Sequence, residues 1–408
     1  MKYLCATHVP VYAGQTPGVL RVTRAHLREL SAQVDALTKA GFDDVTLATP
    51  LYESIDAKTL AAHEIVELPR HARAFHYVPL PSYRTLTQFV RTRSALLEQL
   101  RIAAKDASVV QLGTAGHPVA LGQIAWPVVH ELGKKRIFVI ATDPFPALQK
   151  AINSGRNPAK RIAKQLAVQQ FEKFCLKAVR EASAVFTHSP DVVARFKNVW
   201  HDRCVFLPRP LLSLSEVTEK SPDHFTDVKR PLRLITHAHA DATRGLDHLL
   251  KAVAKARRLA QAINIDLLGD VSDEIVALVR SEKIEPYVRF LGNASPAPAF
   301  AQADVYVTAS LVPTGDPHTP HTPLALAHAL PVVAYAGGAF DERIKSHDAG
   351  IILPRGETDL LGQSLIDLSR NRPRLRTLST NAITLARTLT FEHIHDLRAK
   401  LAMECVKQ

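Results

Sequence analysis

Two histidines stand close together in the second half of the chain, where they could bind a metal ion. His237 and His239 are separated by one residue, a spacing that turns both imidazoles to one side at the end of a strand. His248 follows within the next apolar segment. A structural zinc site needs four ligands, and a His-x-His pair does not by itself supply them. We therefore predict that no metal is bound here.

A second group of polar residues surrounds the pair Thr322-Pro323. Threonine is a good helix N-cap and proline is tolerated at the first helical position, so this pair predicts the start of a helix. The N–H groups at a helix N-terminus favour anions, and we expect a phosphate there. The preceding loop adds further polar side chains, among them Asp316, His318 and Thr319.

The net charge of +12 is concentrated in two windows of the first half. Residues 70–105 hold seven Lys or Arg and the single acid Glu98, and residues 150–180 hold eight and the single acid Glu172. Such a surface attracts phosphates on anionic lipid, on a polyprenyl phosphate or on nucleic acid, unless it is only a solvated face. Nucleic acid is not expected, because aromatic residues make up only 6% of the chain and form no stacking motif.

Length and composition place these residues in a globular protein of two domains. A chain of 408 residues suits two cores of about 200 residues each. No apolar run approaches the roughly 20 residues of a membrane-spanning helix, and the first residues lack the apolar stretch of a secretory signal. The four cysteines form no Cys-x-x-Cys pair, which fits buried thiols in a reducing cytoplasm rather than disulfides or zinc.

Short apolar runs alternate with segments of helical periodicity along the chain. In the first half we expect strands at 3–7, 45–49, 65–68, 74–78, 108–113, 136–141, 184–188 and 205–207, and helices near 18–40, 84–105, 118–132 and 157–182. In the second half we expect strands at 232–236, 263–268, 288–291, 305–309, 332–335 and 350–353, and helices near 245–260, 272–283, 297–302 and 323–329, with a helical end. This spacing predicts parallel βαβ units, and hence an α/β fold with doubly wound sheets.

The alternation is interrupted at 209–230, where no helical or strand periodicity is apparent and a linker is predicted. We therefore divide the chain into a Rossmann-like domain at 1–208, the linker, a second Rossmann-like domain at 231–390 and a helix near 391–407. Two such domains leave a cleft between the carboxyl ends of their sheets, where these folds bind ligands. The pattern by itself does not name the ligand.

Six segments of the second half resemble, in the same order, the second domain of the retaining GT-B glycosyltransferases (group 1, family 4-like). They are the strand and Arg-Gly turn within 232–252, I-D-L-L-G at 265–269, V-R-F-L-G at 288–292, A-D-V-Y-V-T-A-S at 303–310, L-P-V-V-A with its Gly pair at 330–338, and A-G with L-P at 349–354. Each segment is short, and the ordered set carries the resemblance.

The first half resembles this family more loosely, in Gly14 after the first strand and in the segment 182–189. The segment 389–392 resembles the stretch before the family's last helix, which packs back on the first domain. The resemblance implies the GT-B architecture, in which two doubly wound Rossmann-like domains face each other across a cleft. It also implies that the C-terminal domain binds the nucleotide-sugar donor.

The resemblance further implies how the donor diphosphate is held. Arg244 stands where the family has a Lys before Gly, and His237 stands where it usually has an Arg. Gly14 matches a Gly-rich loop over the donor phosphates. Cleavage of the sugar–phosphate bond leaves negative charge on the diphosphate, so all three are expected to bind the donor and Arg244 to act in catalysis. The alternative for Arg244 is an exposed side chain at a helix start.

The family's Glu-x7-Glu motif is degenerate in this sequence. Counted back from Pro331, the second Glu, which binds the donor ribose, is replaced by Leu324, and Asp316 stands eight residues earlier. Leucine accepts no hydrogen bond, so ribose recognition must come from elsewhere or be lost. Asp316 is a catalytic candidate as the carboxylate that faces the sugar, or else an ordinary loop residue. Thr319, Thr322 and the Leu324 position complete the expected donor site.

Two polar residues of the first half fall near positions where the family meets the transferred sugar. His117 follows the strand at 108–113 and is a catalytic candidate, and Asp143 follows the strand at 136–141. For both residues the alternative is a hydrogen bond within the local turn.

We therefore predict a retaining glycosyltransferase of the hexosyltransferase type, which uses a UDP- or GDP-sugar and requires no metal. The acceptor is expected to be a sugar, a lipid-linked molecule or another small molecule, as in polysaccharide or glycolipid biosynthesis. The enzyme is expected in the cytoplasm, with its basic first domain against an anionic membrane surface. The alternative is a non-catalytic GT-B relative that acts as a binding or scaffold protein.

Overall fold

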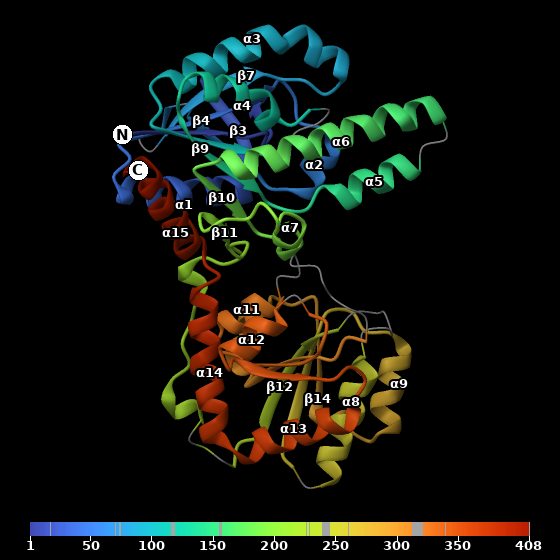
Figure 1. The fold of residues 1–408 in the computed structure, drawn as a ribbon. Helices are drawn as coiled ribbons and strands as arrows, with labels where there is room; N and C mark the ends of the chain where they lie inside the picture. Colours follow the sequence, from blue (N-terminus) through green and yellow to red (C-terminus); the bar gives the residue numbers. More distant parts are fainter. Residues whose placement is uncertain are drawn as a thin grey trace. The chain divides into compact units, whose positions relative to one another are not determined.

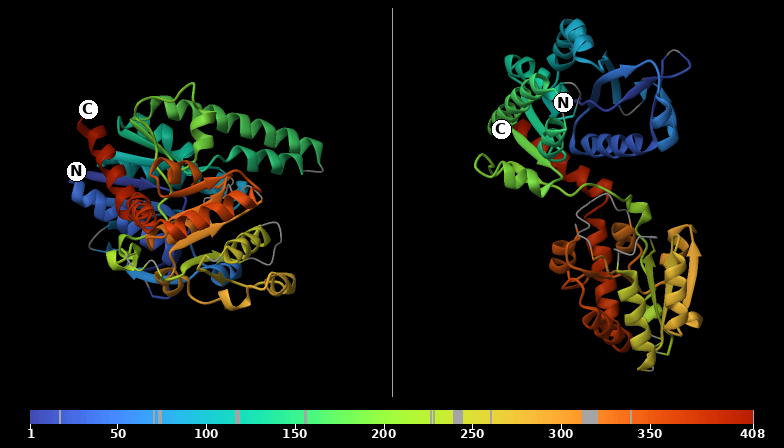
Figure 2. Two further views of the ribbon diagram at one scale, coloured as in Figure 1. Left: turned by 90° about the horizontal axis from the view of Figure 1, so that it is seen from below. Right: turned by 90° about the vertical axis from the view of Figure 1, so that its right-hand side faces the viewer.

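The computed structural model describes the chain except for residues 17, 70, 73–74, 116–118, 155–156, 226, 228, 239–244, 260, 312–320, 339 and 408. The chain divides into two compact units (Figures 1 and 2). The first contains Met1–Arg209 and Ile394–Gln408, and the second contains Pro210–His393. Each unit holds a largely or wholly parallel sheet covered by helices, which confirms the predicted α/β class.

The first unit is built on one large sheet. Its strands are β1 (Lys2–Ala6), β2 (Val11–Ala13), β3 (Val19–Thr23), β4 (Asp44–Tyr52), β5 (Ile65–Pro69), β6 (His71–Ala72), β7 (Phe75–Pro81), β8 (Val109–Gly113), β9 (Lys135–Ile140), β10 (Ala184–Thr187) and β11 (Cys204–Phe206). The order β11-β10-β9-β8-β1-β4 is parallel throughout, and β4 also pairs in parallel with β7 and β2. The strands β3, β5 and β6 pair antiparallel with their neighbours.

Helices cover both faces of this sheet (Figure 1). They are α1 (Arg24–Ala40), α2 (Ala57–Ala62), α3 (Leu86–Lys105), α4 (Leu121–Glu131), α5 (Phe145–Asn153), α6 (Pro158–Glu181), α7 (Pro190–Arg195) and α15 (Phe391–Lys407). The side chains of β1 alternate between two cores. Leu4 and Ala6 pack with α3, α4 and α6, whereas Tyr3 and Cys5 pack with α1 and α15.

The predicted helix over 18–40 is wrong for its first residues. Val19–Thr23 forms β3, in which Leu20 and Val22 are buried, and α1 begins at Arg24. The alternating apolar and polar residues of this segment and its β-branched valines favour a strand. Thr23 then caps the helix, because its hydroxyl accepts a hydrogen bond from the N–H of His26.

The second unit contains a wholly parallel sheet among its described residues. Its strands are β12 (Leu232–His237), β13 (Ile263–Leu268), β14 (Val288–Gly292), β15 (Val305–Thr308), β16 (Val332–Tyr335) and β17 (Gly350–Leu353). They follow the order β14-β13-β12-β15-β16-β17. The chain winds outward from β12 in one direction and from β15 in the other, so a topological switch point lies between these two strands.

The helices of the second unit again cover both faces of its sheet. They are α8 (Leu246–Arg258), α9 (Asp273–Ser281), α10 (Pro296–Gln302), α11 (His321–Ala327), α12 (Asp341–Ser346), α13 (Thr358–Arg370) and α14 (Arg372–Arg387). Leu234 of β12 packs with α8 and α13, and its neighbour Ile235 packs with α11 and α12 on the opposite face.

The segment 209–230, predicted as a linker, packs on the second unit. The Lys220 ammonium donates hydrogen bonds to backbone carbonyls within 300–303, and burial lowers the pKa of Lys220 to about 8. Arg230 forms an ion pair with the fully buried Asp304. These contacts tie the segment to the second unit, although it contains no β-strand and no α-helix among its described residues.

The four cysteines are buried free thiols. Burial raises the pKa of Cys5 and of Cys175 to about 12, so both are protonated at neutral pH. Among the described helices, none is long and apolar enough to cross a membrane.

Buried basic groups lie where α15 packs on the first unit. Ile394, Ala399 and other residues of α15 enter the same core as Tyr3. Arg398 is 6% exposed and donates a hydrogen bond to Oε1 of Gln111 at 3.2 Å. Burial, reinforced by the charge of Arg398, lowers the pKa of His188 to about 4 and that of His395 to about 2. Both imidazoles are therefore neutral at pH 7.

These two histidines predict that the first unit loses stability in mild acid. Between the unfolded pKa of about 6.5 and the lower folded values, the unfolded chain binds more protons, so the free energy of unfolding falls as the pH falls. Each of the two histidines is expected to cost about 1.4 kcal/mol per pH unit in this range. Urea unfolding between pH 7 and pH 5 measures this cost, since both tryptophans, Trp126 and Trp200, lie in the first unit and report on it by fluorescence.

The variant His395→Gln should make this pH dependence shallower, because it removes one titrating group. The matched control is His63→Gln, since His63 is exposed. An unchanged slope in His395→Gln would show that His395 does not cause the loss.

Candidate functional site

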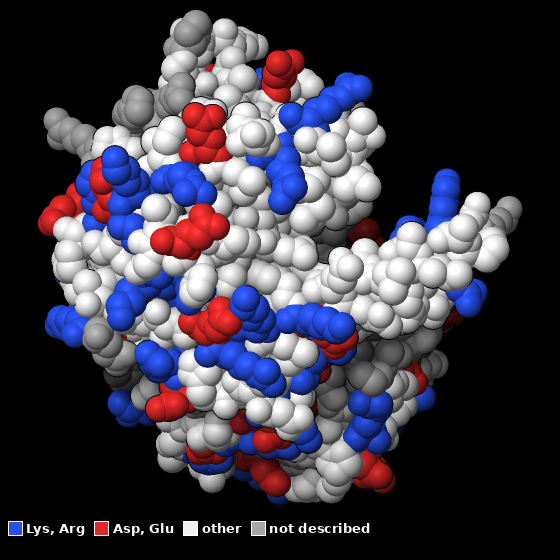
Figure 3. Space-filling model, turned by 45° about the horizontal axis from the view of Figure 1, so that its top comes forward, with Lys and Arg blue, Asp and Glu red and all other residues white. Residues whose placement is uncertain are grey.

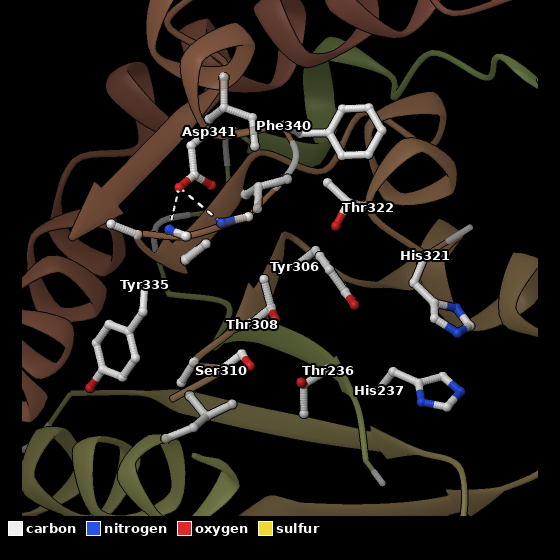
Figure 4. A pocket seen from close by; sticks show the side chains of 18 of the residues that line it. Thr236, His237, Tyr306, Thr308, Ser310, His321, Thr322, Tyr335, Phe340 and Asp341 are labelled. Carbon is white, nitrogen blue, oxygen red and sulfur yellow. Dashed lines mark hydrogen bonds between the residues drawn. The ribbon is translucent and has the colours of Figure 1, made fainter. Parts of the chain in front are cut away.

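A pocket lies in the second unit at the carboxyl ends of β12, β15 and β16 (Figure 4). Its polar lining comes from strand ends and from the first residues of α11 and α12, namely Thr236, His237, Tyr306, Thr308, Ser310, His321, Thr322, Tyr335 and Asp341. Since the strands are parallel, their carboxyl ends meet at one edge of the sheet, and the switch point between β12 and β15 opens this edge. The pocket is therefore where a doubly wound domain is expected to bind a ligand.

Gly245, directly before α8, lies against the residue that follows β15. It has a φ of 64°, and a Cβ atom at this position would lie 2.0 Å from the carbonyl oxygen of Ala309. Any other residue would clash there, since real Cβ atoms are never so close to an oxygen, and would also adopt a left-handed conformation that L-residues disfavour. The glycine of the Arg-Gly pair noted in the sequence is thus required by the backbone.

Two histidines from different elements stack beside the pocket. His237 ends β12 and His321 begins α11, and their ring centroids are 3.9 Å apart with an angle of 27° between the planes. Gly269 leaves room for this arrangement, because a Cβ atom there would lie 3.2 Å from Cε1 of His237. Imidazole nitrogens can donate to a phosphate oxygen, so the pair supplies suitable groups for an anionic ligand.

The turn between β16 and α12 is held by a carboxylate. Oδ2 of Asp341 accepts hydrogen bonds from the N–H groups of Gly337 at 2.7 Å and of Gly338 at 3.0 Å (Figure 4). This contact fixes the backbone that follows the last strand of the pocket. The Gly pair of the resemblance is therefore ordered by a side chain four residues further along the chain.

A hydrogen-bonded group supports another wall of the pocket. Nδ1 of His248 lies 3.2 Å from the hydroxyl of Tyr335 and 2.8 Å from Oγ1 of Thr358. Burial raises the pKa of Tyr335. His248, weighed in the sequence as a third metal ligand, is thus used to position Tyr335.

The structure changes the expected role of Thr322. The sequence predicted Thr322 as the N-cap. The helix begins at His321, however, so Thr322 lies in its first turn. Pro323 is tolerated in this first turn, because the first N–H groups of a helix have no partner within it and proline lacks an N–H. Thr322 nevertheless lines the pocket.

Leu324 is not one of the residues that line the pocket. It packs, half-buried, against an apolar cluster that includes Leu212, Phe300 and Leu330. At this position of α11, where the resemblance implies a ribose-binding carboxylate, the side chain contributes to the core.

The remaining predicted site residues are Gly14 and four residues whose structure is not described. His117, Arg244, Asp316 and Thr319 fall outside the described residues. Gly14 lies in the first unit, where its N–H donates to the carbonyl of Val19 at 2.9 Å and closes the hairpin of β2 and β3. A Cβ atom on Gly14 would lie 2.8 Å from Val19, so the glycine is required by this turn.

Asp143 serves the local turn, which is the alternative that the sequence left open for it. Its Oδ1 accepts a hydrogen bond from the N–H of Phe145, and its Oδ2 pairs with Nε of Arg195 at 2.8 Å.

The first unit has a hollow of its own at the carboxyl ends of β4 and β7. It is lined by polar side chains that include Glu53, Arg84 and Gln88. The guanidinium of Arg84 lies 5.0 Å from the centre of the Tyr52 ring, close enough for a cation–π contact. A polar molecule with hydroxyl groups would find both donors and acceptors here.

Several pocket residues were not identified from the sequence. Thr236, Thr308 and Ser310 belong to segments noted there, but no role was assigned to them. A polar residue directly after a buried apolar run is the signal that could have found them, because such a run ends at the carboxyl edge of the sheet. Tyr335 and Asp341 carry no such signal, since their roles depend on contacts made only in the folded unit.

Comparisons with known proteins show what this fold and the second unit are similar to. Residues 232–371 match the family model of the group 1 glycosyl transferases. The fold is similar to that of HepE from Anabaena, solved in complex with UDP, with a TM-score of 0.54 and 14% identity over 98% of this chain and 99% of that chain. It is also similar to a glycosyltransferase from Rickettsia africae, with a TM-score of 0.57 and 14% identity over 100% and 99% of the two chains.

A third similar structure is the sucrose-phosphate synthase of Thermosynechococcus elongatus, with a TM-score of 0.50 and 15% identity over 98% of both chains. No curated protein matches the sequence. The chain therefore has the GT-B fold along its whole length, and its second unit carries a group 1 glycosyl transferase region that contains the pocket. Together these findings support a GT-B glycosyltransferase.

The close approach at Gly245 predicts a large loss of stability in Gly245→Ala. We expect a cost of about 3 kcal/mol or more, because the new Cβ must displace the end of β15 as well as adopt a left-handed conformation. The matched control is Gly292→Ala, since Gly292 has a φ of 54° and open space around its Cβ position. It should cost only about 1 kcal/mol. Equal losses in thermal unfolding would contradict the proposed clash.

Proposed function

We propose that the protein is a retaining glycosyltransferase that moves a sugar from a UDP- or GDP-sugar to an acceptor and requires no metal. The observation that carries this proposal is the pocket at the switch point of the second sheet, which lies within the residues that match the group 1 family. Its stacked histidines and hydroxyl groups suit a nucleotide diphosphate. HepE, solved with UDP, has the same fold, and this supports a nucleotide donor.

In the proposed reaction the leaving diphosphate acquires negative charge as its bond to the sugar breaks. Groups that bind this charge more strongly in the transition state than in the substrate lower the barrier. We assign this role to Arg244, aided by His237 and by the hydroxyl of Thr322. Asp316 and His117 are proposed to face the transferred sugar, Thr319 to bind the donor, and Gly14 to lie in the loop over the donor phosphates.

The acceptor is proposed to bind the first unit, in the hollow lined by Glu53, Arg84 and Gln88. These groups offer hydrogen bonds to sugar hydroxyls and a positive charge for a phosphate. A lipid-linked sugar fits both features, as well as the basic windows of this unit, and would place the enzyme at the cytoplasmic face of a membrane. Polysaccharide or glycolipid biosynthesis is the corresponding role.

The alternative is a non-catalytic relative that binds a partner or a nucleotide sugar without transfer. Leu324 favours it, because the residue that binds the ribose in the family is here a half-buried apolar side chain. The polar lining of the pocket favours the enzyme, since polar side chains around a pocket that had lost its ligand would not be expected to persist.

The diphosphate role of Arg244 predicts that Arg244→Ala lowers turnover about 100-fold or more, by analogy with removal of one transition-state donor. The donor is first chosen by a thermal-shift screen of UDP- and GDP-sugars, since a ligand that binds only the folded protein raises the melting temperature. The matched control is Arg280→Ala, at an exposed arginine of α9. Near-normal turnover in Arg244→Ala would remove this residue from the mechanism, and the absence of any donor effect would contradict the proposed function.

The packing of Leu324 predicts that Leu324→Glu does not improve donor binding, because a carboxylate there would be buried among apolar side chains. If instead the site has only lost the side chain that binds the donor ribose, the new carboxylate should tighten donor binding about ten- to a hundred-fold. Calorimetric titration with one matched nucleotide sugar separates these outcomes. Leu324→Gln is the control, since glutamine has nearly the same shape as glutamate but carries no charge. Tighter binding by Leu324→Glu alone, with an inactive natural protein, would favour the non-catalytic alternative.

A further inference from the structure

The helices α5 and α6 form an arm that projects from the first unit (Figures 1 and 2). The base of the arm is anchored by Phe145 and Phe171, whose ring centroids are 5.8 Å apart and which pack against the main core. The outer part of α6 is different, because every residue from 158 to 167 is exposed. Figure 3 shows the arm standing away from the unit, with Lys or Arg toward its end.

The outer part of α6 carries an apolar side and a basic side. Ile162 and Leu166 are one helical turn apart and 64% and 54% exposed. Lys160, Arg161 and Lys164 are one or two residues from Ile162 along the chain and therefore lie on other sides of the helix. The first acidic residue of the helix is Glu172. This stretch is therefore a short amphipathic segment with positive charge only.

Both features are unfavourable for a helix in water. Basic residues near a helix N-terminus oppose the positive end of the helix dipole, and α6 has no acidic residue in its first turn. Large aliphatic side chains at this exposure leave apolar surface in contact with solvent. None of the three basic residues forms an ion pair with a described residue. An anionic surface with an apolar interior relieves both costs at once.

We propose that the outer part of α6, residues 158–167, docks on an anionic lipid surface. The ammonium and guanidinium groups would contact lipid phosphates, while Ile162 and Leu166 enter the boundary between headgroups and acyl chains. A folded protein partner is less suited, because two isolated aliphatic side chains offer little area for an interface. The inference deepens the membrane role within the proposed function by naming the element that makes the contact.

The test is co-sedimentation of the full chain with phosphatidylcholine vesicles, with and without 30% phosphatidylglycerol, as the salt concentration is raised. We expect binding only with the anionic lipid, weakened by salt. The variant Lys160→Gln/Arg161→Gln/Lys164→Gln should lose about 100-fold in affinity, and Ile162→Ser/Leu166→Ser at least tenfold. The control Arg280→Gln/Lys283→Gln/Arg376→Gln has the same net charge as the first variant, and Leu259→Ser matches the exposure of Leu166 at 54%. Both controls should bind as the natural protein does.

A second exposed apolar pair in the same unit, Leu86 and Val90 of α3, provides the sharpest comparison, since they are 61% and 66% exposed near Arg91 and Arg93. Leu86→Ser/Val90→Ser should retain most of the binding. The proposal is overturned if this variant alone loses binding, if the α6 variants bind normally, or if neutral vesicles bind equally well. The α6 variants should keep the thermal shift caused by nucleotide sugar. The two readouts are independent. Absence of vesicle binding in the natural protein would contradict this inference, whereas absence of the nucleotide-sugar thermal shift would contradict the proposed function.

Discussion

In a parallel sheet every strand delivers its last residue to the same edge, and this geometric constraint determines where the second unit can bind a ligand. The winding reverses between β12 and β15, so the helices that follow them diverge and leave that part of the edge open. Gly245, directly before α8, lies against Ala309 at the end of β15. The stacked His237 and His321 and the hydroxyl groups around them lie where they do because the strand ends meet at this edge.

The same constraint explains how much the sequence could predict. Buried parallel strands are apolar along their whole length, so the strands of the second unit were predicted within about two residues of their observed ends. The short strand Val19–Thr23 was missed, because its apolar residues continue into a helix of similar composition and only the cap at Thr23 separates them. The pocket's location follows from the strand order, whereas the contacts of Asp341 and Tyr335 follow from tertiary packing and have no local pattern.

Two positions of the resemblance, Gly245 and Leu324, have different physical consequences. At the Arg-Gly turn the glycine is required by the backbone, so that part of the pattern reports on the fold. At Leu324, where the resemblance implies a ribose-binding carboxylate, the side chain packs on the core, so the match of the fold does not extend to this functional position. A resemblance carried mainly by glycines and buried strands therefore fixes the architecture more firmly than it fixes the chemistry.

Hydrogen–deuterium exchange of the full chain, with and without UDP or GDP at saturating concentration, tests the central claim most directly. A nucleotide held at the carboxyl edge of the second sheet should slow exchange in peptides that cover 232–246, 305–311 and 321–341. Peptides at the far edge, such as those of β14, should exchange as before. Protection confined to the first unit, or none with either nucleotide, would contradict a donor pocket at the switch point between β12 and β15.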